Sequence, residues 1–258
     1  MNRLLAACCL AVLTFTIPQI AGAQSNDAFN GPHVGVTLGY YMDRSVARAS
    51  TVFSPTGYFA ASSVTAINNN GVQKVAPNGF IGGGEVGVDW KLAIFMVGVE
   101  GDFSATNGRD QRGVTVAYPC CSPARFTLTH SLSTNWLLTA RPRVGMKVGP
   151  VMAYITGGYA LTHIKYEEVF TDTFAAAHEN ADFRQNKSGY TVGAGIGFAT
   201  HGHYIVKVEY LYAGFGRNTV TSTNLTAFAT RTAFPSNPFT ASDTLHMHVV
   251  RAGFDYHF

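Results

Sequence analysis

One glycine pattern in this chain has the spacing of a nucleotide-binding loop. Gly82, Gly84 and Gly87, in the stretch FIGGGEVGVDWKL, satisfy G-x-G-x-x-G, which cradles a pyrophosphate where a strand meets a helix. The residues around these glycines instead alternate between apolar and polar side chains, and a second alternating stretch, IFMVGVEGDFS, follows within a few residues. Because two such stretches predict a β-hairpin, we expect no dinucleotide, and we expect no other cofactor.

Three side chains near the C terminus have the chemistry of a hydrolase. Thr244, His246 and His248 share one parity in an alternating stretch, so they would lie on one face of a strand. A nucleophile–histidine site also needs a paired hydroxyl and an acid that orients the imidazole, and Asp243 has the opposite parity. The pattern predicts that the protein is not an enzyme.

Cysteine and histidine pairs offer too few ligands for a metal centre. Cys120 and Cys121 are neighbours in YPCCSP, and His201 and His203 are separated by one residue. Because structural zinc sites use four ligands, we expect no metal at either pair, and the sequence predicts no other metal site. In an exported protein the cysteines can form a vicinal disulfide or an intermolecular bridge, and the sequence leaves both open.

The start of the chain has the features of an export signal. A basic start, an apolar run and an Ala-x-Ala pattern that ends at Ala23 predict a signal peptide at 1–23 and one domain at 24–258. The chain carries a formal charge of +3 over 258 residues, and 13% of its residues are charged. That small charge predicts no nucleic-acid partner. After the signal, no apolar run approaches the ~18 residues of a membrane helix.

Eight stretches alternate between apolar and polar residues and predict eight β-strands. They are HVGVTLGYY, FIGGGEVGVDWKL, IFMVGVEGDFS, WLLTARPRVGMKV, VMAYITGGYAL, YTVGAGIGF, YIVKVEYLY and HVVRAGFDYHF. Long connectors, expected at about 42–78, 104–127, 167–187 and 215–244, alternate with tight turns. This asymmetry is typical of membrane β-barrels. The sequence therefore predicts an all-β fold, an eight-stranded antiparallel up-and-down transmembrane barrel.

The two faces of the predicted strands differ in residue size. One face carries glycine, threonine, serine and scattered charges, and the other carries bulky apolar and aromatic side chains. An eight-stranded barrel has only a narrow lumen, so the small residues belong inside and the bulky ones face lipid. The outward aromatic residues expected at the two interfaces, as girdles, are Tyr40, Trp90, Trp136, Tyr159, Tyr204, Tyr210 and Tyr212.

Charged residues gather on the predicted inward face. The acids are Glu85, Asp89, Glu100, Asp102, Glu209 and Asp255, and the bases are Arg141, Arg143, Lys147, Lys207 and Arg251, with Lys91 at the rim. Unpaired charges in a narrow lumen are costly, so this near-balance predicts a cross-strand ion-pair network. Such a network can plug the barrel or form a selectivity ring for a water-filled path, and the small strand number favours the plug.

The order of these stretches resembles the Gram-negative outer-membrane β-barrel proteins of the porin-like surface-antigen type, which are common in alphaproteobacteria. The matching pieces include GFIGGGEVGVDWKL, RPRVGMKVG, VKVEYLYAGFG and the closing VRAGFDYHF, and together they cover most of the chain. The resemblance implies residence in the bacterial outer membrane and no general enzymatic activity. It also implies that Phe254, Tyr256 and Phe258 form the signal that the barrel-assembly machinery reads during insertion. Cys120 and Cys121 depart from the family pattern.

Three functions remain as hypotheses. The first is a plugged barrel that supports envelope integrity, contacts outer-membrane lipid and lipopolysaccharide, and presents loops to partners that the sequence does not identify. The second is a narrow porin-like channel for ions or small solutes, and the third is a lipid-modifying enzyme. In the long connectors, aromatic residues either form an exposed apolar surface or fold over the barrel mouth. They are Tyr58, Phe59, Phe228, Phe234 and Phe239.

Overall fold

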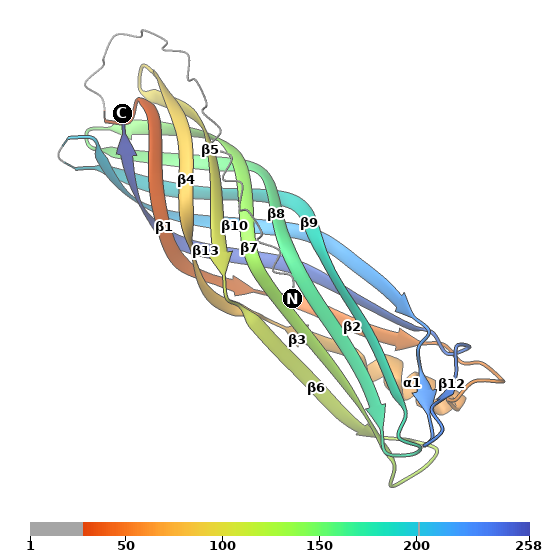
Figure 1. The fold of residues 1–258 in the computed structure, drawn as a ribbon. Helices are drawn as coiled ribbons and strands as arrows, with labels where there is room; N and C mark the ends of the chain where they lie inside the picture. Colours follow the sequence, from red (N-terminus) through yellow and green to blue (C-terminus); the bar gives the residue numbers. More distant parts are fainter. Residues whose placement is uncertain (1–27, 201) are drawn as a thin grey trace, which may run out of the picture.

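Eight antiparallel strands close into a ring in the computed structural model, which describes residues 28–200 and 202–258. Each ring strand pairs with the next along the chain, and the last pairs with the first, so the ring leaves no free edge (Figure 1). This confirms the predicted eight-stranded barrel. The predicted signal peptide, 1–23, lies outside the described residues. The ring strands are β1 (Gly31–Asp43), β4 (Asn78–Leu92), β5 (Phe95–Thr106), β7 (Arg125–Val148), β8 (Val151–Asp172), β9 (His178–Ala199), β10 (Tyr204–Ser222) and β13 (Phe239–His257).

The glycine-rich stretch lies within β4 and does not form a loop before a helix. β4 pairs with β1 on one side and with β5 on the other along nearly its whole length. The dinucleotide interpretation is therefore excluded by the geometry. Glycine has a different use here, because a Cβ atom at Gly87 would lie 2.5 Å from the ring of His33. The missing side chain makes room for that imidazole inside the barrel.

A second group of elements lengthens the barrel at one end, where sequence alone predicted long loops. These elements are β2 (Ser45–Thr51), β3 (Val72–Val75), β6 (Arg109–Ala117), β11 (Thr226–Ala227), β12 (Thr232–Ala233) and the helix α1 (Ala61–Asn70). β2 pairs with the start of β13, and β6 pairs with the start of β7. The prediction of loops is therefore wrong for most of these residues, which form strands and a helix. We call this end, together with the adjoining halves of β7–β10 and β13, the extension (Figure 1).

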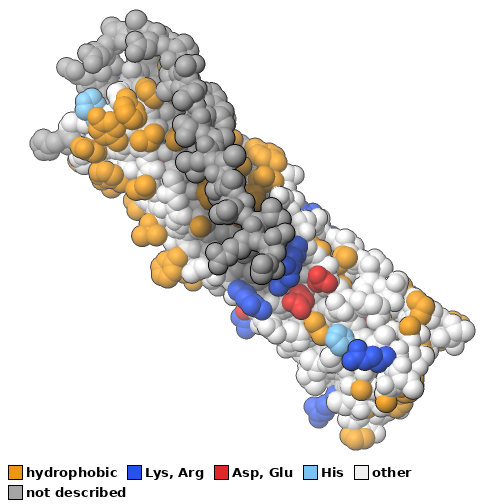
Figure 2. Space-filling model, in the orientation of Figure 1, with side chains coloured by type: hydrophobic (Ala, Val, Ile, Leu, Met, Phe, Trp, Pro, Cys, Tyr) orange, Lys and Arg blue, Asp and Glu red, His pale blue; other side chains and the backbone are white. Residues whose placement is uncertain are grey.

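Exposed apolar side chains cover the other end of the barrel. Figure 2 shows them spread over the half that carries the C terminus, whereas the charged groups in this view lie beyond it. Val36 is 63% exposed and Ile155 is 65% exposed, values that suit a surface facing hydrocarbon. We call this surface the belt. Its members include Val34, Val36, Leu38, Val86, Val99, Phe103, Val144, Ile155, Ile196, Val206, Val208, Val250 and Phe254.

The interior of the barrel is filled in successive zones. At the end nearest the C terminus an apolar cluster forms around Phe29, Met152 and Tyr154. A charged zone follows, and then a larger apolar cluster built on residues such as Tyr166 and Leu245 occupies the extension. A further apolar cluster lies among the elements at its far end. In the described part of the chain, α1 is the only α-helix, and it is too short to cross a bilayer.

Candidate functional site: a charged layer inside the barrel

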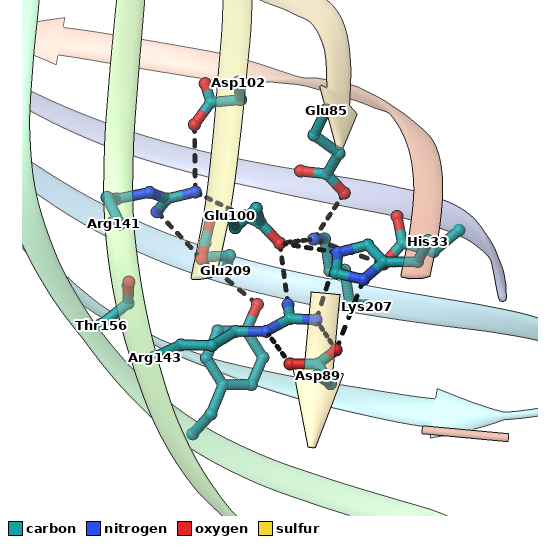
Figure 3. Close-up of polar contacts among 12 residues, drawn as sticks. His33, Glu85, Asp89, Glu100, Asp102, Arg141, Arg143, Thr156, Lys207 and Glu209 are labelled. Atoms are coloured by element: carbon teal, nitrogen blue, oxygen red, sulfur yellow. Dashed lines mark hydrogen bonds and ion pairs between the residues drawn. The ribbon is translucent and has the colours of Figure 1, made fainter. Parts of the chain in front are cut away.

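Ten charged side chains converge within the part of the lumen that the belt surrounds. They come from five ring strands, and each is 5% exposed or less. Strand alternation places them inward, because their neighbours in sequence belong to the belt. We call this set the charged layer (Figure 3). Its members are Glu85 and Asp89 on β4, Glu100 and Asp102 on β5, Arg141 and Arg143 on β7, Lys207 and Glu209 on β10, and Arg251 and Asp255 on β13.

Arg141 is the most enclosed cation of the charged layer, with no exposed surface. Its guanidinium donates to Glu100 Oε1 at 2.6 Å, to Asp102 Oδ2 at 3.0 Å and to Glu209 Oε1 at 3.1 Å. Arg251 reaches two of the same acids, donating to Glu209 Oε2 at 2.8 Å and to Asp102 Oδ1 at 2.9 Å. The two guanidiniums and the three carboxylates, which come from four strands, therefore form one connected set.

Arg143 and Lys207 form the other half of the charged layer. Arg143 donates to Glu100 Oε2 at 2.8 Å and holds Asp89 with two nitrogens, one of them Nε at 2.8 Å from Oδ1 (Figure 3). Lys207 Nζ lies 2.5 Å from Glu85 Oε1 and 2.8 Å from Glu100 Oε2. Glu100 thus bridges both halves. Buried ions are tolerated when they are paired and hydrogen-bonded in this way.

Acids outnumber bases in the charged layer by six to four. The sequence had suggested a closer balance, with Lys147 among the inward bases. Lys147 also faces the interior, because its partner on β8 is the buried Met152, but it lies nearer the end of the barrel, half-buried, with its Nζ 5.5 Å from the centre of the Phe29 ring. Lys91, expected at the rim, is exposed. The layer is therefore rich in negative charge.

Three inward side chains beside the charged layer were not identified as site residues from the sequence. His33 lies 3.4 Å from Asp89 Oδ2 through Nδ1, and its ring stacks on that of His257. Tyr154 donates to Glu209 Oε1 at 3.2 Å, and Arg143 lies over its ring. Strand alternation could have assigned His33 and Tyr154 to the lumen, because each is adjacent to an outward apolar residue in its strand.

The predicted girdle residues lie on the outside of the barrel, toward the two ends of the belt. Tyr40, Trp90, Tyr159, Tyr204 and Tyr210 are each 43–50% exposed. The other two, Trp136 and Tyr212, are half-buried. Trp136 sits at a β-bulge of β7 and packs against Phe103, with ring centres 6.0 Å apart.

Comparison with known proteins assigns the family. A profile of the outer membrane protein beta-barrel domain matches residues 7–258. The chain belongs to this family. It is accordingly a protein of the bacterial outer membrane, of the porin-like surface-antigen type. The 31 kDa outer-membrane immunogenic protein of Brucella melitensis is 28% identical over 193 residues, which cover 73% of this chain and 70% of the relative.

Two solved protein structures are similar to this chain at low sequence identity. OprG from Pseudomonas aeruginosa is 10% identical, with a TM-score of 0.40, and the match covers 89% of this chain and 97% of OprG. Ail of Yersinia pestis is 14% identical, with a TM-score of 0.33, and the match covers 88% of this chain and 99% of Ail.

The hydrolase-like residues of this family member point away from Asp243, the acid nearest to them in sequence. His246 and His248 face outward on β13, where their Nδ1 atoms lie 2.8 Å from the hydroxyl of Tyr212 and 2.7 Å from that of Tyr210. Asp243 is buried inside and accepts from Asn218. His203 lies in a turn, and its partner in the H-x-H pair, His201, is outside the described residues.

The C-terminal aromatic residues also face outward. Phe254 is 47% exposed and Phe258 is 67% exposed. Phe254 stacks on Tyr204 of the neighbouring strand β10, and Phe258 meets Tyr256 edge to face. These rings therefore lie on the belt surface at the end opposite the extension, where an assembly factor could reach them.

The connectors of the extension are held together by one carboxylate, that of Asp172. Its Oδ2 accepts from the hydroxyls of Tyr58 at 2.6 Å and Tyr118 at 2.9 Å, and its Oδ1 accepts from the N–H groups of Ala175 and Ala177. Burial and the neighbouring carboxylate raise the pKa of both tyrosines above its usual range. Asp172 therefore ties three connectors to one point.

The predicted loop aromatics divide between the interior and the surface. Phe59 and Phe239 are buried, Tyr58 and Phe234 are half-buried, and Phe228 is 48% exposed. Some of these residues are therefore buried and others form an exposed apolar surface, so each of the two predicted alternatives holds for part of the set. The neighbouring cysteines, Cys120 and Cys121, form a vicinal disulfide in the same region.

Replacement of Asp172 by alanine should loosen the connectors without opening the ring. Four donors lose their acceptor, and a donor left unpaired in a buried place costs about 1–3 kcal/mol. We expect faster hydrogen–deuterium exchange at Ala175 and Ala177, and tyrosine titration, followed by ultraviolet absorbance, with the pKa of Tyr58 and Tyr118 shifted back toward its ordinary value. Asp182→Ala, on the outer face of β9, serves as the control. Unchanged exchange at the connectors would show that Asp172 does not hold them.

Proposed function

We propose that this protein is a plugged outer-membrane barrel that supports envelope integrity and presents its extension to the exterior. The observation that carries the proposal is the enclosure of Arg141, which has no exposed surface and bonds three carboxylates from two other strands. A cation in a water-filled path would keep part of its hydration. Here protein oxygens replace water, and the apolar clusters on either side of the charged layer add to the plug.

Conductance separates this proposal from its alternative, a narrow porin-like channel. The full-length barrel, inserted into planar bilayers at low ionic strength, should show no steady open state, because ion passage would have to displace paired charges from the charged layer. A steady open conductance under a small applied voltage would overturn the plug and support the channel. A large porin inserted in the same bilayers provides the positive control.

The proposal gives the barrel no catalytic role. Its support is the position of His246 and His248, which face outward with tyrosine partners and without a carboxylate beside them in the described structure. Incubation of the refolded barrel with outer-membrane lipid should leave the lipid profile unchanged.

We expect two kinds of contact at the outer surface of the barrel. Lys165 on β8 lies directly opposite Arg184 on β9, on the outward face of the extension beyond the belt. Like charges placed opposite each other repel, and a phosphate of lipopolysaccharide would relieve that repulsion. At the other end, Phe254, Tyr256 and Phe258 form the surface that we assign to the barrel-assembly machinery during insertion.

A further inference from the structure

Two imidazoles and one carboxylate converge at the end of the charged layer that lies nearest the C terminus. His33 on β1, Asp89 on β4 and His257 on β13 are each 1% exposed. One ligand atom from each lies within 4.8 Å of the other two. Figure 3 shows His33 and Asp89 facing each other beside Arg143. The ring pairing of β1 with both β4 and β13 creates this convergence.

The imidazole nitrogens of this group lack the partners that buried polar atoms usually have. Both ring nitrogens of His257, and Nδ1 of His33, make no hydrogen bond within the described residues. In folded proteins the great majority of such atoms are hydrogen-bonded, and each exception calls for an explanation. A further electron-pair acceptor between the rings would account for two of these nitrogens, His33 Nδ1 and one nitrogen of His257, because the two nitrogens of one imidazole cannot bind the same ion.

The spacing of the first two ligand atoms fits a metal ion. His33 Nδ1 and Asp89 Oδ2 are 3.4 Å apart. Two ligands at about 2.0–2.1 Å from a tetrahedral zinc ion are separated by about 3.3 Å. The His257 ring stacks on His33 with centres 4.7 Å apart, so it must tilt to direct a nitrogen into the same shell.

The neighbours of the group select which atoms can serve as ligands. Arg143 lies 3.2 Å from His33 Nε2, and an arginine can only donate. Metal binding through Nδ1 puts the proton of the neutral imidazole on Nε2, so this contact must open when the ion binds. Arg143 also donates to both oxygens of Asp89, and a hydrogen-bonded carboxylate of this kind is a common support for a metal ligand. The absent side chain at Gly87 leaves the space that the His33 ring fills.

The charge of the surroundings favours a cation despite Arg143. The charged layer holds six acids and four bases, so two carboxylates have no base of their own to offset them. A divalent cation at its edge would supply the missing positive charge, and buried carboxylates in excess are costly without it. The excess of carboxylates is the same whether or not the lumen conducts.

We propose that His33 Nδ1, the carboxylate of Asp89 and one imidazole nitrogen of His257 bind a divalent transition-metal ion of the zinc class. Imidazole and carboxylate ligands suit zinc, and three protein ligands leave a fourth position for water. The ion would join β1 to β4 and β13, the strands on either side of it. It would therefore crosslink the ring where the first and last strands meet.

The direct test is metal binding to the full-length barrel in detergent micelles after treatment with a chelator. We expect one Zn²⁺ per chain by elemental analysis after dialysis, a visible-range Co²⁺ spectrum of a four-coordinate site, and a higher unfolding temperature with Zn²⁺ than without it. Zinc should protect only the folded barrel, because the three ligands are far apart in sequence. Absence of bound zinc in the wild-type protein would overturn the proposal without any variant.

Variants identify the ligands. His33→Ala and His257→Ala should each weaken zinc binding by more than the roughly 10–100-fold that changes outside the ligand shell cause. His163→Ala is the matched control, because His163 lies on the outer face of β8 and pairs with Asn186. Where an alanine variant does not fold, His257→Gln keeps the size of the side chain. Zinc binding that survives loss of both His33 and His257 would place the ion elsewhere and refute this site.

Discussion

Replacing Arg141 by alanine is expected to lower the free energy of unfolding by about 3–5 kcal/mol, the usual cost of removing one partner of a buried ion pair. The change leaves Glu100, Asp102 and Glu209 without a shared donor in a layer where acids are already in excess. The measurement is urea unfolding in detergent micelles, followed by tryptophan fluorescence, with wild-type and variant compared under identical conditions.

Two controls on this prediction use the same chain. Arg125→Ala removes an exposed arginine from the same strand, β7, and should change stability by at most about 0.5 kcal/mol. Glu85→Gln removes one acid from a layer in which acids outnumber bases, and the amide oxygen can still accept from Lys207 Nζ, which lies 2.5 Å from Glu85 Oε1, so it should cost much less than Arg141→Ala. Equal costs for Arg141 and Arg125 would show that water, not carboxylate, satisfies the guanidinium of Arg141.

Removal of a base is expected to cost more stability than removal of an acid because of the composition of the charged layer. Loss of a base increases the excess of negative charge, whereas loss of an acid reduces it. The same excess underlies the proposed metal site. We therefore expect zinc to recover more of the stability that is lost on removal of Arg143 or Lys207 than of the stability that is lost on removal of an acid.

The membrane-facing part of the fold could be predicted from the sequence because one rule governs it. Within the belt, outward residues are apolar and most inward residues are small or charged, as with Ile155 and Thr156 on β8. Period-two alternation therefore located all eight ring strands. The residues of the charged layer could be assigned to the lumen for the same reason, although alternation alone could not say which acid meets which base.

The extension could not be predicted by that rule because the rule reverses there. On β8 the outward residues of the belt, Ile155 and Tyr159, are apolar, but beyond the belt the inward residues, Ile164 and Tyr166, are the apolar ones. Water replaces lipid outside, so the core moves inside the ring. A search for outward apolar residues ends where this change occurs, and the remaining strand residues are then taken for loops.

The candidate metal site was missed for a different reason. Its three ligands come from β1, β4 and β13, which meet only when the ring closes. Sequence patterns for metal sites rely on ligands that are close together along the chain. His33 and Asp89 are brought together by strand register, which the pattern of alternation leaves free to slip by two residues.

The second large effect is expected from two acids buried in the extension. Glu168 on β8 and Glu179 on β9 have almost no exposed surface, and their carboxyl groups lie close enough to interact with each other. Burial raises the pKa of both groups, and for Glu168 the neighbouring carboxyl of Glu179 raises it further. Two other buried acids behave alike, because burial raises the pKa of Asp43 to about 7 and that of Asp243 to about 6.

These shifts fix the sign of the pH dependence. A carboxyl group with a raised pKa binds a proton more tightly in the folded protein than in the unfolded chain. Between the unfolded and folded pKa values the folded state holds more protons, so the free energy of unfolding falls as pH rises. His130 acts in the opposite direction only below about pH 6.5, because burial lowers its pKa to about 4. The acids therefore dominate above that pH.

Glu168→Gln should remove the largest part of this dependence. An uncharged amide of nearly the same shape has no proton to lose, so at pH 8 the variant should be more stable than wild type by about 1 kcal/mol or more. At pH 6.5 the difference should be smaller, because wild-type Glu168 is then more often protonated. Hydrogen–deuterium exchange along β8 and β9 measures the effect where it arises. Glu167→Gln, on the outer face of β8, should change neither value. If Glu168→Gln exchanges faster than wild type at pH 8, the Glu168 carboxylate has a stabilising partner, and the extension is not destabilised by its buried acids.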